Sequence, residues 1–411
     1  MPGRYVGEQP QMVGDCRLFP REHAYHADVR TLPTEEVDGE DVPDIWDRRM
    51  GSPEMGWWAF GYADAPPPLW SEVPGMPVNL LRPDDSEATV PRLIRVGSRN
   101  FNGPYRSNLG PTALPYLYKG VAQSLQQTIP VPVGVITPFP LLFPPPISAD
   151  QARIQQDPLR YGDRHMFVLD ARGPAASSDP CVSWEFAEAA RPDELDWFGE
   201  TFWAETGSRW PLGGPDAFDG LVDSSGGASP ANRFAGADAA ALPMAPAIIR
   251  TDELADGVVD HATLLVLPSN LIRRASSGDS GAQWPAFTSD GGNIIEEGEA
   301  DDAGAAPRMG SWIRLRDGYP LTGDPQVDAV LNGLKVHGAI LHDSGQENSW
   351  GLAFEPDTKW DFEDVSRLRQ VKLSEFEMID PTPMRAGAMT AAGTIPTVTQ
   401  ANDWFKVRNG P

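Results

Sequence analysis

Short stretches in which hydrophobic and polar residues alternate recur along the chain from about residue 165 onward. In 181–189 (CVSWEFAEA) and 311–316 (SWIRLR) the alternation puts apolar and polar side chains on opposite faces, as in a half-buried β-strand. Alternating or continuous apolar runs predict further strands at 165–171, 247–251, 261–268, 336–343 and 350–356. The pattern therefore favours a protein built mainly from strands.

Helical signals are sparse. Residues 324–338 begin with Asp324 as an N-cap and Pro325 at the first helical position, and Val327, Val330 and Leu334 fall on one face. A second short helix is predicted at 362–371. Many strands with so few helices predict an all-β fold: a large β-sandwich or jelly-roll-like domain with a few short covering helices.

Proline and glycine punctuate the apolar stretches throughout. The 42 Pro and 40 Gly among 411 residues indicate many ordered turns between short strands. The segment 113–149 is apolar, nearly uncharged and rich in proline, which cannot donate to a central ladder, so an edge position is expected. We interpret the chain as an N-terminal arm (1–15), one elaborated domain (16–380) carrying the 113–149 insertion, and a tail (381–411). The insertion either contacts another subunit or packs over its own domain.

The charge balance narrows the possible partners. The formal net charge is −25, which repels phosphate backbones and anionic lipid, so nucleic-acid and membrane-surface binding are not expected. No run of 18 apolar residues predicts a transmembrane helix, and residues 1–16 lack the apolar region of a secretory signal peptide.

Six segments, in order along 16–380, carry a resemblance to a known group of proteins. They are CRLFPREHAYHADVRTLP (16–33), GDRHMFVLD (162–170), ADAAALPMAPAIIRTDEL (237–254), DHATLLVL (260–267), PRMGSWIRLR (307–316), and HGAILHDSG with PDTKWDFEDVSRLRQVKLSEFEMID (337–345 and 356–380). The chain resembles a widespread, functionally unassigned family of secreted bacterial proteins. In this chain Tyr25-His26 stands where the family usually has Trp-Asn.

The resemblance implies an extracellular destination and a placement for both cysteines. Cys16 and Cys181 look similarly placed to two cysteines of the relatives. If paired, they close a loop of about 165 residues and contribute ~5 kcal/mol by chain entropy. The alternative is two buried free thiols. Without a signal peptide, release with a virus particle is one route to the outside.

Three Asp/His dyads lie at predicted strand ends within the family-like segments. They are Asp163 with His165, Asp260 with His261, and His342 with Asp343. If they converge, a histidine oriented by a carboxylate can act as a general base, with Glu185 or Glu188 as an acid. The plainer interpretation, favoured by the lack of a nucleophile motif, is that the dyads satisfy buried backbone groups and hold loops.

Other candidates are weaker. The GDSG motif at 278–281 indicates a turn rather than a protease, since no triad or barrel pattern accompanies it. No HExxH, Cys/His cluster or EF-hand loop predicts a metal site, although Asp28, Asp163 and Asp343 are the oxygen ligands a Ca²⁺ site would use.

Tryptophans offer stacking platforms for sugars, because an aromatic ring packs on a pyranose face. The candidates are Trp57, Trp58, Trp184, Trp197, Trp203 and Trp350. The alternative is that each fills a gap beneath the Pro/Gly-rich loops.

These observations favour an extracellular structural or glycan-recognising component of a larger assembly, such as a phage tail or virion-surface protein. Its partners would be protein subunits, as a homo-oligomer, and a cell-surface glycan, with no cofactor required. The alternatives are a polysaccharide-active hydrolase or lyase, or a stand-alone saccharide-binding protein.

Overall fold

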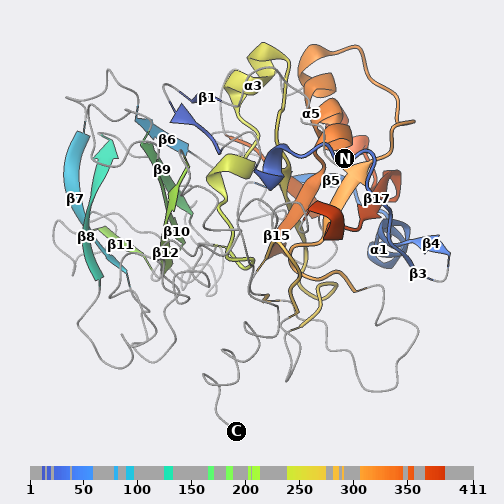
Figure 1. Cartoon of the computed structure of the whole chain (residues 1–411), viewed down its shortest axis with the longest axis horizontal. Helices are drawn as coiled ribbons and strands as arrows, with labels where there is room; N and C mark the ends of the chain where they lie inside the picture. The colour runs from blue at the N-terminus through green and yellow to red at the C-terminus, as the bar shows by residue number, and fades with distance from the viewer. Residues whose placement is uncertain are drawn as a thin grey trace, which may run out of the picture.

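In the computed structural model, the described part of the chain forms five β-sheets of two to six strands and a few helices (Figure 1). The described residues are 12–13, 16–19, 23–37, 39–58, 78–81, 89–96, 125–132, 165–170, 182–187, 202–204, 206–212, 238–274, 281–286, 289–290, 306–345, 350–355 and 366–384. This part of the chain is rich in strands and poor in helices, which is compatible with a mostly-β fold.

The largest sheet has six strands in the order β17-β14-β15-β13-β16-β5. Its members are β5 (Met55–Trp58), β13 (Thr263–Pro268), β14 (Trp312–Leu315), β15 (Ala339–Gly345), β16 (Trp350–Ala353) and β17 (Phe376–Ile379). The two central strands, β13 and β15, run parallel, and every residue of β13 is buried. Parallel strands covered on both faces read as continuous apolar runs, which explains the sequence TLLVLP in β13.

Helices pack against the six-stranded sheet. The helix α5 (Pro325–Val336) begins at Asp324, whose side chain accepts hydrogen bonds from the backbone N–H groups of Gln326 and Val327, as predicted. It packs against β14 and against α3 (Thr251–Asp256), beside which it lies in Figure 1. The helix α1 (Val42–Met50), which the sequence pattern did not predict, packs against β17 and the 3₁₀ helix η9 (Leu373–Glu375).

Two further sheets come from the middle of the chain. One has the order β12-β10-β9-β6 and the other β11-β7-β8. The strands are β6 (Val78–Leu81), β7 (Thr89–Val96), β8 (Leu125–Pro132), β9 (Met166–Asp170), β10 (Val182–Ala187), β11 (Phe202–Ala204) and β12 (Thr206–Pro211). The strand β8 also contacts β6 and β9, so the two sheets lie next to each other (Figure 1).

Two short hairpins complete the strand list. They are β1 (Met12–Val13) with β2 (Cys16–Arg17), and β3 (Glu36–Val37) with β4 (Glu40–Asp41). Through the first pair, residues 12–13 of the predicted arm join the start of the domain.

Most strand predictions are confirmed, and one is wrong. The predictions at 165–171, 181–189, 261–268, 311–316, 336–343 and 350–356 each overlap an observed strand. Residues 247–251 do not form one: the 3₁₀ helix η7 (Ala245–Ala247) is followed by a single bridge between Ile249 and Phe354, and α3 begins at Thr251. The predicted helix at 362–371 is, in its described part, the 3₁₀ helix η8 (Ser366–Gln370).

The described part of the proline-rich segment 113–149 forms a strand at the edge of a sheet. Its described part, β8, pairs antiparallel with β7 from Leu125 opposite Val96 to Pro132 opposite Thr89, and it is the last strand of its sheet. An edge strand has one side without ladder partners, so prolines are tolerated there. The remainder of 113–149 lies outside the described residues.

Gly338 is a position where only glycine fits. Its φ is +73°, and a Cβ there would lie 2.3 Å from the carbonyl oxygen of Ile313 and 2.9 Å from Nε1 of Trp312. The turn between α5 and β15 is thereby pressed against β14.

We expect Gly338→Ala to destabilise the protein more than Gly323→Ala. Gly323 has a similar φ of +85° but no heavy atom within 4 Å of the added Cβ, so both variants carry the left-handed backbone cost of about 1–2 kcal/mol. The clash adds about 1–3 kcal/mol at Gly338 alone. Chemical denaturation measures both, and equal losses would contradict the packing described here.

Candidate functional site

The parallel pair β13–β15 brings together Asp260, a predicted site residue, and His337. Thr263 lies opposite Ala339, so both strands begin at the same edge of the sheet. The residues just before each strand must therefore meet, and Nε2 of His337 lies 3.2 Å from a carboxylate oxygen of Asp260. The other ring nitrogen of His337 contacts the carbonyl oxygen of Ala27 at 3.0 Å. Asp260 thus pairs with His337 rather than with its sequence neighbour His261.

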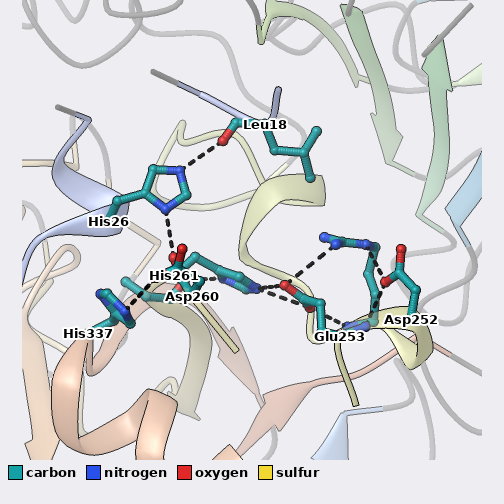
Figure 2. A network of polar contacts seen from close by, with 9 residues as sticks. Leu18, His26, Asp252, Glu253, Asp260, His261 and His337 are labelled. Atoms are coloured by element: carbon teal, nitrogen blue, oxygen red, sulfur yellow. Dashed lines mark hydrogen bonds and ion pairs between the residues drawn. The ribbon is translucent and has the colours of Figure 1, made fainter. Parts of the chain in front are cut away.

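His26 fastens the N-terminal segment to this edge (Figure 2). Its Nδ1 lies 2.6 Å from the carbonyl oxygen of Asp260, and its Nε2 lies 2.8 Å from that of Leu18. Burial lowers the pKa of His26, whereas the two carbonyl oxygens oppose that shift. Ala24–His26 form the 3₁₀ helix η1, which His23 caps by accepting the Tyr25 N–H.

His261 belongs to a buried ion-pair network with Glu253 and Arg250 (Figure 2). Its Nε2 lies 3.1 Å from Glu253 Oε1, and the Arg250 guanidinium lies 3.5 Å from the same carboxylate. Burial opposes ionisation of Glu253, but Arg250 and His261 outweigh it and lower the pKa of Glu253 to about 2. Glu253 also accepts the Arg250 backbone N–H at 2.8 Å, which begins α3. The network therefore anchors a helix start.

A second group of buried polar residues, here the carboxylate–histidine cluster, consists of Tyr25, Glu185, Asp238 and His342. It forms at a β-bulge: the register of β13 with β15 shifts from Leu265 opposite Leu341 to Val266 opposite Asp343, leaving His342 unopposed. Nδ1 of His342 donates to Asp238 Oδ2 at 2.9 Å. The side chains of both residues have 0% of their surface exposed.

Tyr25 closes the chain of contacts beyond His342. Its hydroxyl lies 3.1 Å from His342 Nε2 and 3.2 Å from the carbonyl oxygen of Pro243, two acceptors for one hydrogen. Burial, reinforced by Asp238 and Glu185, raises the pKa of Tyr25 well above its usual value. The phenol therefore stays protonated near neutral pH.

Glu185 joins β10 to the segment that follows Asp238. Its carboxylate accepts the backbone N–H of Met244 at 2.9 Å, the N–H of Ala245 at 3.0 Å and the Ser183 hydroxyl at 2.9 Å. Burial is the largest influence and raises the pKa of Glu185 to about 7, against the opposing effect of the three donors. Burial likewise raises the pKa of Asp238, which His342 opposes.

Two residues with positive φ flank the cluster. Ala241 has φ 57° inside the turn that Asp238 closes by accepting the Leu242 N–H at 2.9 Å. Phe19 has φ 66°, and its ring stacks on His23 with centroids 3.8 Å apart. Each conformation costs of order 1 kcal/mol, so the surrounding contacts must hold both residues in place.

His165 and Asp343 come from different predicted dyads and lie close together. Nε2 of His165 is 3.8 Å from Asp343 Oδ2. Burial lowers the pKa of His165 to about 3, so its ring is neutral and too weakly basic for efficient general-base catalysis near pH 7. Asp343 also accepts the Ser344 N–H at 2.9 Å.

The predicted convergence of the dyads therefore occurs only in part. His165 meets Asp343, whereas Asp260 pairs with His337 and His261 pairs with Glu253. The orienting carboxylates are Asp238 for His342 and Glu253 for His261, neither of which was a predicted catalytic residue. Tyr25 was also missed as a polar partner. Asp238, Glu253 and Tyr25 all lie in the family-like segments, and that position is the sequence signal that could have identified them.

Two of the six tryptophan candidates have described side chains. Trp350 is fully buried, packs edge-on against Phe376 at 5.8 Å and donates from Nε1 to the carbonyl oxygen of Pro53, so it is a core residue and its predicted role as a platform is corrected. Trp184 is half-buried in β10. Trp57 and Trp58 end β5, and Trp203 pairs with Arg95 of β7. The side chains of these three tryptophans, and the whole of Trp197, lie outside the described residues.

Several other predictions fall on positions that are not described. These are Asp163, Glu188, Cys181 and residues 278–280 of the GDSG motif. Of the predicted Ca²⁺ ligands, Asp28 is held by Arg30 through contacts of 3.0 and 2.7 Å. Among the described residues, no group of three or more His, Cys, Asp or Glu is arranged to hold a metal ion.

Comparisons give no relative: no family model, no curated protein and no solved structure matches the chain. Among the described helices, none combines the length and apolarity needed to cross a bilayer.

We expect Glu253→Gln to destabilise the protein in a pH-dependent way. With a folded pKa near 2 and an ordinary value of 4.5, ionised Glu253 contributes about 3 kcal/mol above pH 4.5, and this is lost as the pH falls towards 2. The gap in unfolding free energy between wild type and variant should shrink by about half between pH 5 and pH 3.

The matched control is Glu377→Gln. Glu377 pairs with Arg314 at 2.9 Å nearer the surface, so its loss should cost about 1 kcal/mol or less. A Glu253 variant no more destabilised than this control would contradict the buried network.

Proposed function

We propose that this protein is an extracellular structural or glycan-recognising component of a larger assembly, such as a phage tail or virion-surface protein. The observation that carries the proposal is β8, an edge strand drawn from the apolar, nearly uncharged segment 113–149. An edge with free N–H and C=O groups is where a strand of another molecule can add. The net charge of −25 suits a protein that must stay soluble before it assembles.

The polar residues support a structural role over a catalytic one. Tyr25, Glu185 and His342 have 0% of their surface exposed and Asp238 has 5%. Their hydrogen bonds go to each other, to the Ser183 hydroxyl and to backbone groups of Leu242, Pro243, Met244 and Ala245. Buried polar groups satisfied in this way hold segments together.

The proposed architecture is a β-sandwich or jelly-roll-like arrangement within the mostly-β fold. The contacts of β8 with β6 and β9 support two adjacent layers in the middle of the chain. The mixed six-stranded sheet, with its parallel central pair, is an addition to that plan.

A polysaccharide-active enzyme is the second candidate, favoured by one observation. Glu185 and Asp238 are two neighbouring carboxylates whose pKa values are both raised, as in the acid of a glycosidase. Such an enzyme would need the cluster to open to substrate. Release of reducing ends from a polysaccharide panel by the wild type, abolished in Glu185→Gln, would favour this candidate over the first.

The assembly proposal predicts a homo-oligomer in solution. Light scattering on the full chain should give a multiple of the 44.7 kDa protomer mass. Gln126→Lys with Thr128→Lys, two positions on one face of the edge strand, should shift the mass towards the protomer, since edge lysines block strand addition.

The uncharged control Gln126→Asn with Thr128→Ser should keep the oligomer. A wild-type protein that is monomeric at micromolar concentrations, or lysine and control variants that behave alike, would contradict assembly through β8.

The glycan-recognising form of the proposal points to Trp184, the half-buried tryptophan of the platform set. Trp184→Ala should weaken binding on a glycan array by about 0.5–1.5 kcal/mol if its ring stacks on a sugar. Trp184→Phe keeps a ring and should retain most of the affinity. If the wild type binds no glycan on the array, the glycan-recognising form of the proposal is rejected and only the structural role remains.

A further inference from the structure

The segment 238–249 connects two sheets. Towards the six-stranded sheet, the N–H of Ala240 donates to the carbonyl oxygen of His342, and the N–H of Ile249 donates to that of Ala353. Towards the four-stranded sheet, the N–H groups of Met244 and Ala245 donate to the carboxylate of Glu185 in β10. We call this last pair of hydrogen bonds the Glu185 joint.

We propose that the Glu185 joint is a proton-controlled fastening between the four-stranded sheet and segment 238–249, closed when Glu185 is protonated and eased when it ionises. The inference does not depend on the proposed function.

The local geometry suits both protonation states of Glu185. The ionised carboxylate accepts from both amides and from the Ser183 hydroxyl. The two amides can only donate, but a hydroxyl both donates and accepts. Protonated Glu185 therefore keeps all its partners if the Ser183 hydroxyl turns to accept.

The surroundings favour the protonated state. Glu185 and Asp238 are both buried, and each carboxylate raises the cost of charging the other. Tyr25 and His342 also interact with these carboxylates. Tyr25 stays neutral, and His342 is already engaged by Asp238. The carboxylates of Glu185 and Asp238 thus have one imidazole to offset their charge, that of His342, and it is already paired with Asp238.

The direction of the pH effect follows from linkage. Burial raises the pKa of Glu185 to about 7, above its ordinary 4.5, so the folded state holds the proton more tightly than the open state. The resulting stability is fully present below pH 4.5 and is lost as the pH rises through 7. Rising pH therefore eases the joint.

The test is the unfolding equilibrium constant of the full chain from pH 5 to pH 8, for wild type and Glu185→Gln. The variant keeps the shape but cannot titrate. The wild-type constant divided by that of the variant should rise about tenfold per pH unit between pH 5 and 6.5 and level off above pH 7. A ratio that stays constant across this range would overturn the proposal.

Glu377→Gln is the control, because it removes one carboxylate from the acidic chain at a site whose partner is Arg314 rather than a histidine. Its ratio to wild type should stay flat from pH 5 to 8, which separates the effect of Glu185 from the general repulsion of an acidic chain. A rise equal to that of Glu185→Gln would contradict a specific role for the joint.

Hydrogen exchange of the wild type gives an independent measurement if Glu185→Gln does not fold. After correction for intrinsic rates, protection of the Met244 and Ala245 amides should fall between pH 5 and pH 7.5. The amides of β13, which do not contact Glu185, should change less. Protection at Met244 and Ala245 that does not vary with pH would contradict the proposal.

Discussion

The parallel pairing of β13 with β15 determines where the buried polar side chains of this protein meet. Its starting edge collects His337, Asp260 and His26, and its bulge turns His342 out of register towards Asp238. A buried polar group without a partner costs about 1–3 kcal/mol, so each of these side chains must find one. The segments that supply the partners are thereby fixed against the sheet.

The partners come from chain segments that lack regular structure of their own. Residues 238–249 contain a turn, a 3₁₀ helix and a single bridge, and their backbone N–H groups attach them to Glu185 and to the carbonyl oxygens of His342 and Ala353. Carboxylates hold such a segment because they accept several N–H groups at once. The same contacts keep Ala241 in its positive-φ conformation.

This arrangement explains why residues typical of active sites are buried here. The Asp–His–Tyr chain through Asp238, His342 and Tyr25 has the order of a catalytic relay, but its last member is a phenol with a strongly raised pKa. Its contacts go to the backbone rather than to an open site. We therefore interpret it as part of the framework that positions the sheets.

Local sequence patterns predicted much of the fold but little of the polar network. Alternation identified β10 and β14, and the Asp324 cap identified α5, because these signals are contained within one element. Residues 247–251 look like a strand, yet Glu253 caps the following helix and draws them into a turn. The partner of His342 is Asp238, which is 104 positions away, so sequence spacing favoured the adjacent Asp343 instead.

The central claim is that buried carboxylate–histidine pairs hold the framework together. A double-mutant cycle of Asp238→Ala and His342→Ala in unfolding free energy tests it most directly. We expect each single variant to be destabilised by about 3 kcal/mol or more and the pair to be coupled by about 1–3 kcal/mol. Catalytic residues are often replaced at no cost in stability. Single variants as stable as the wild type, with no coupling between the two sites, would contradict the account.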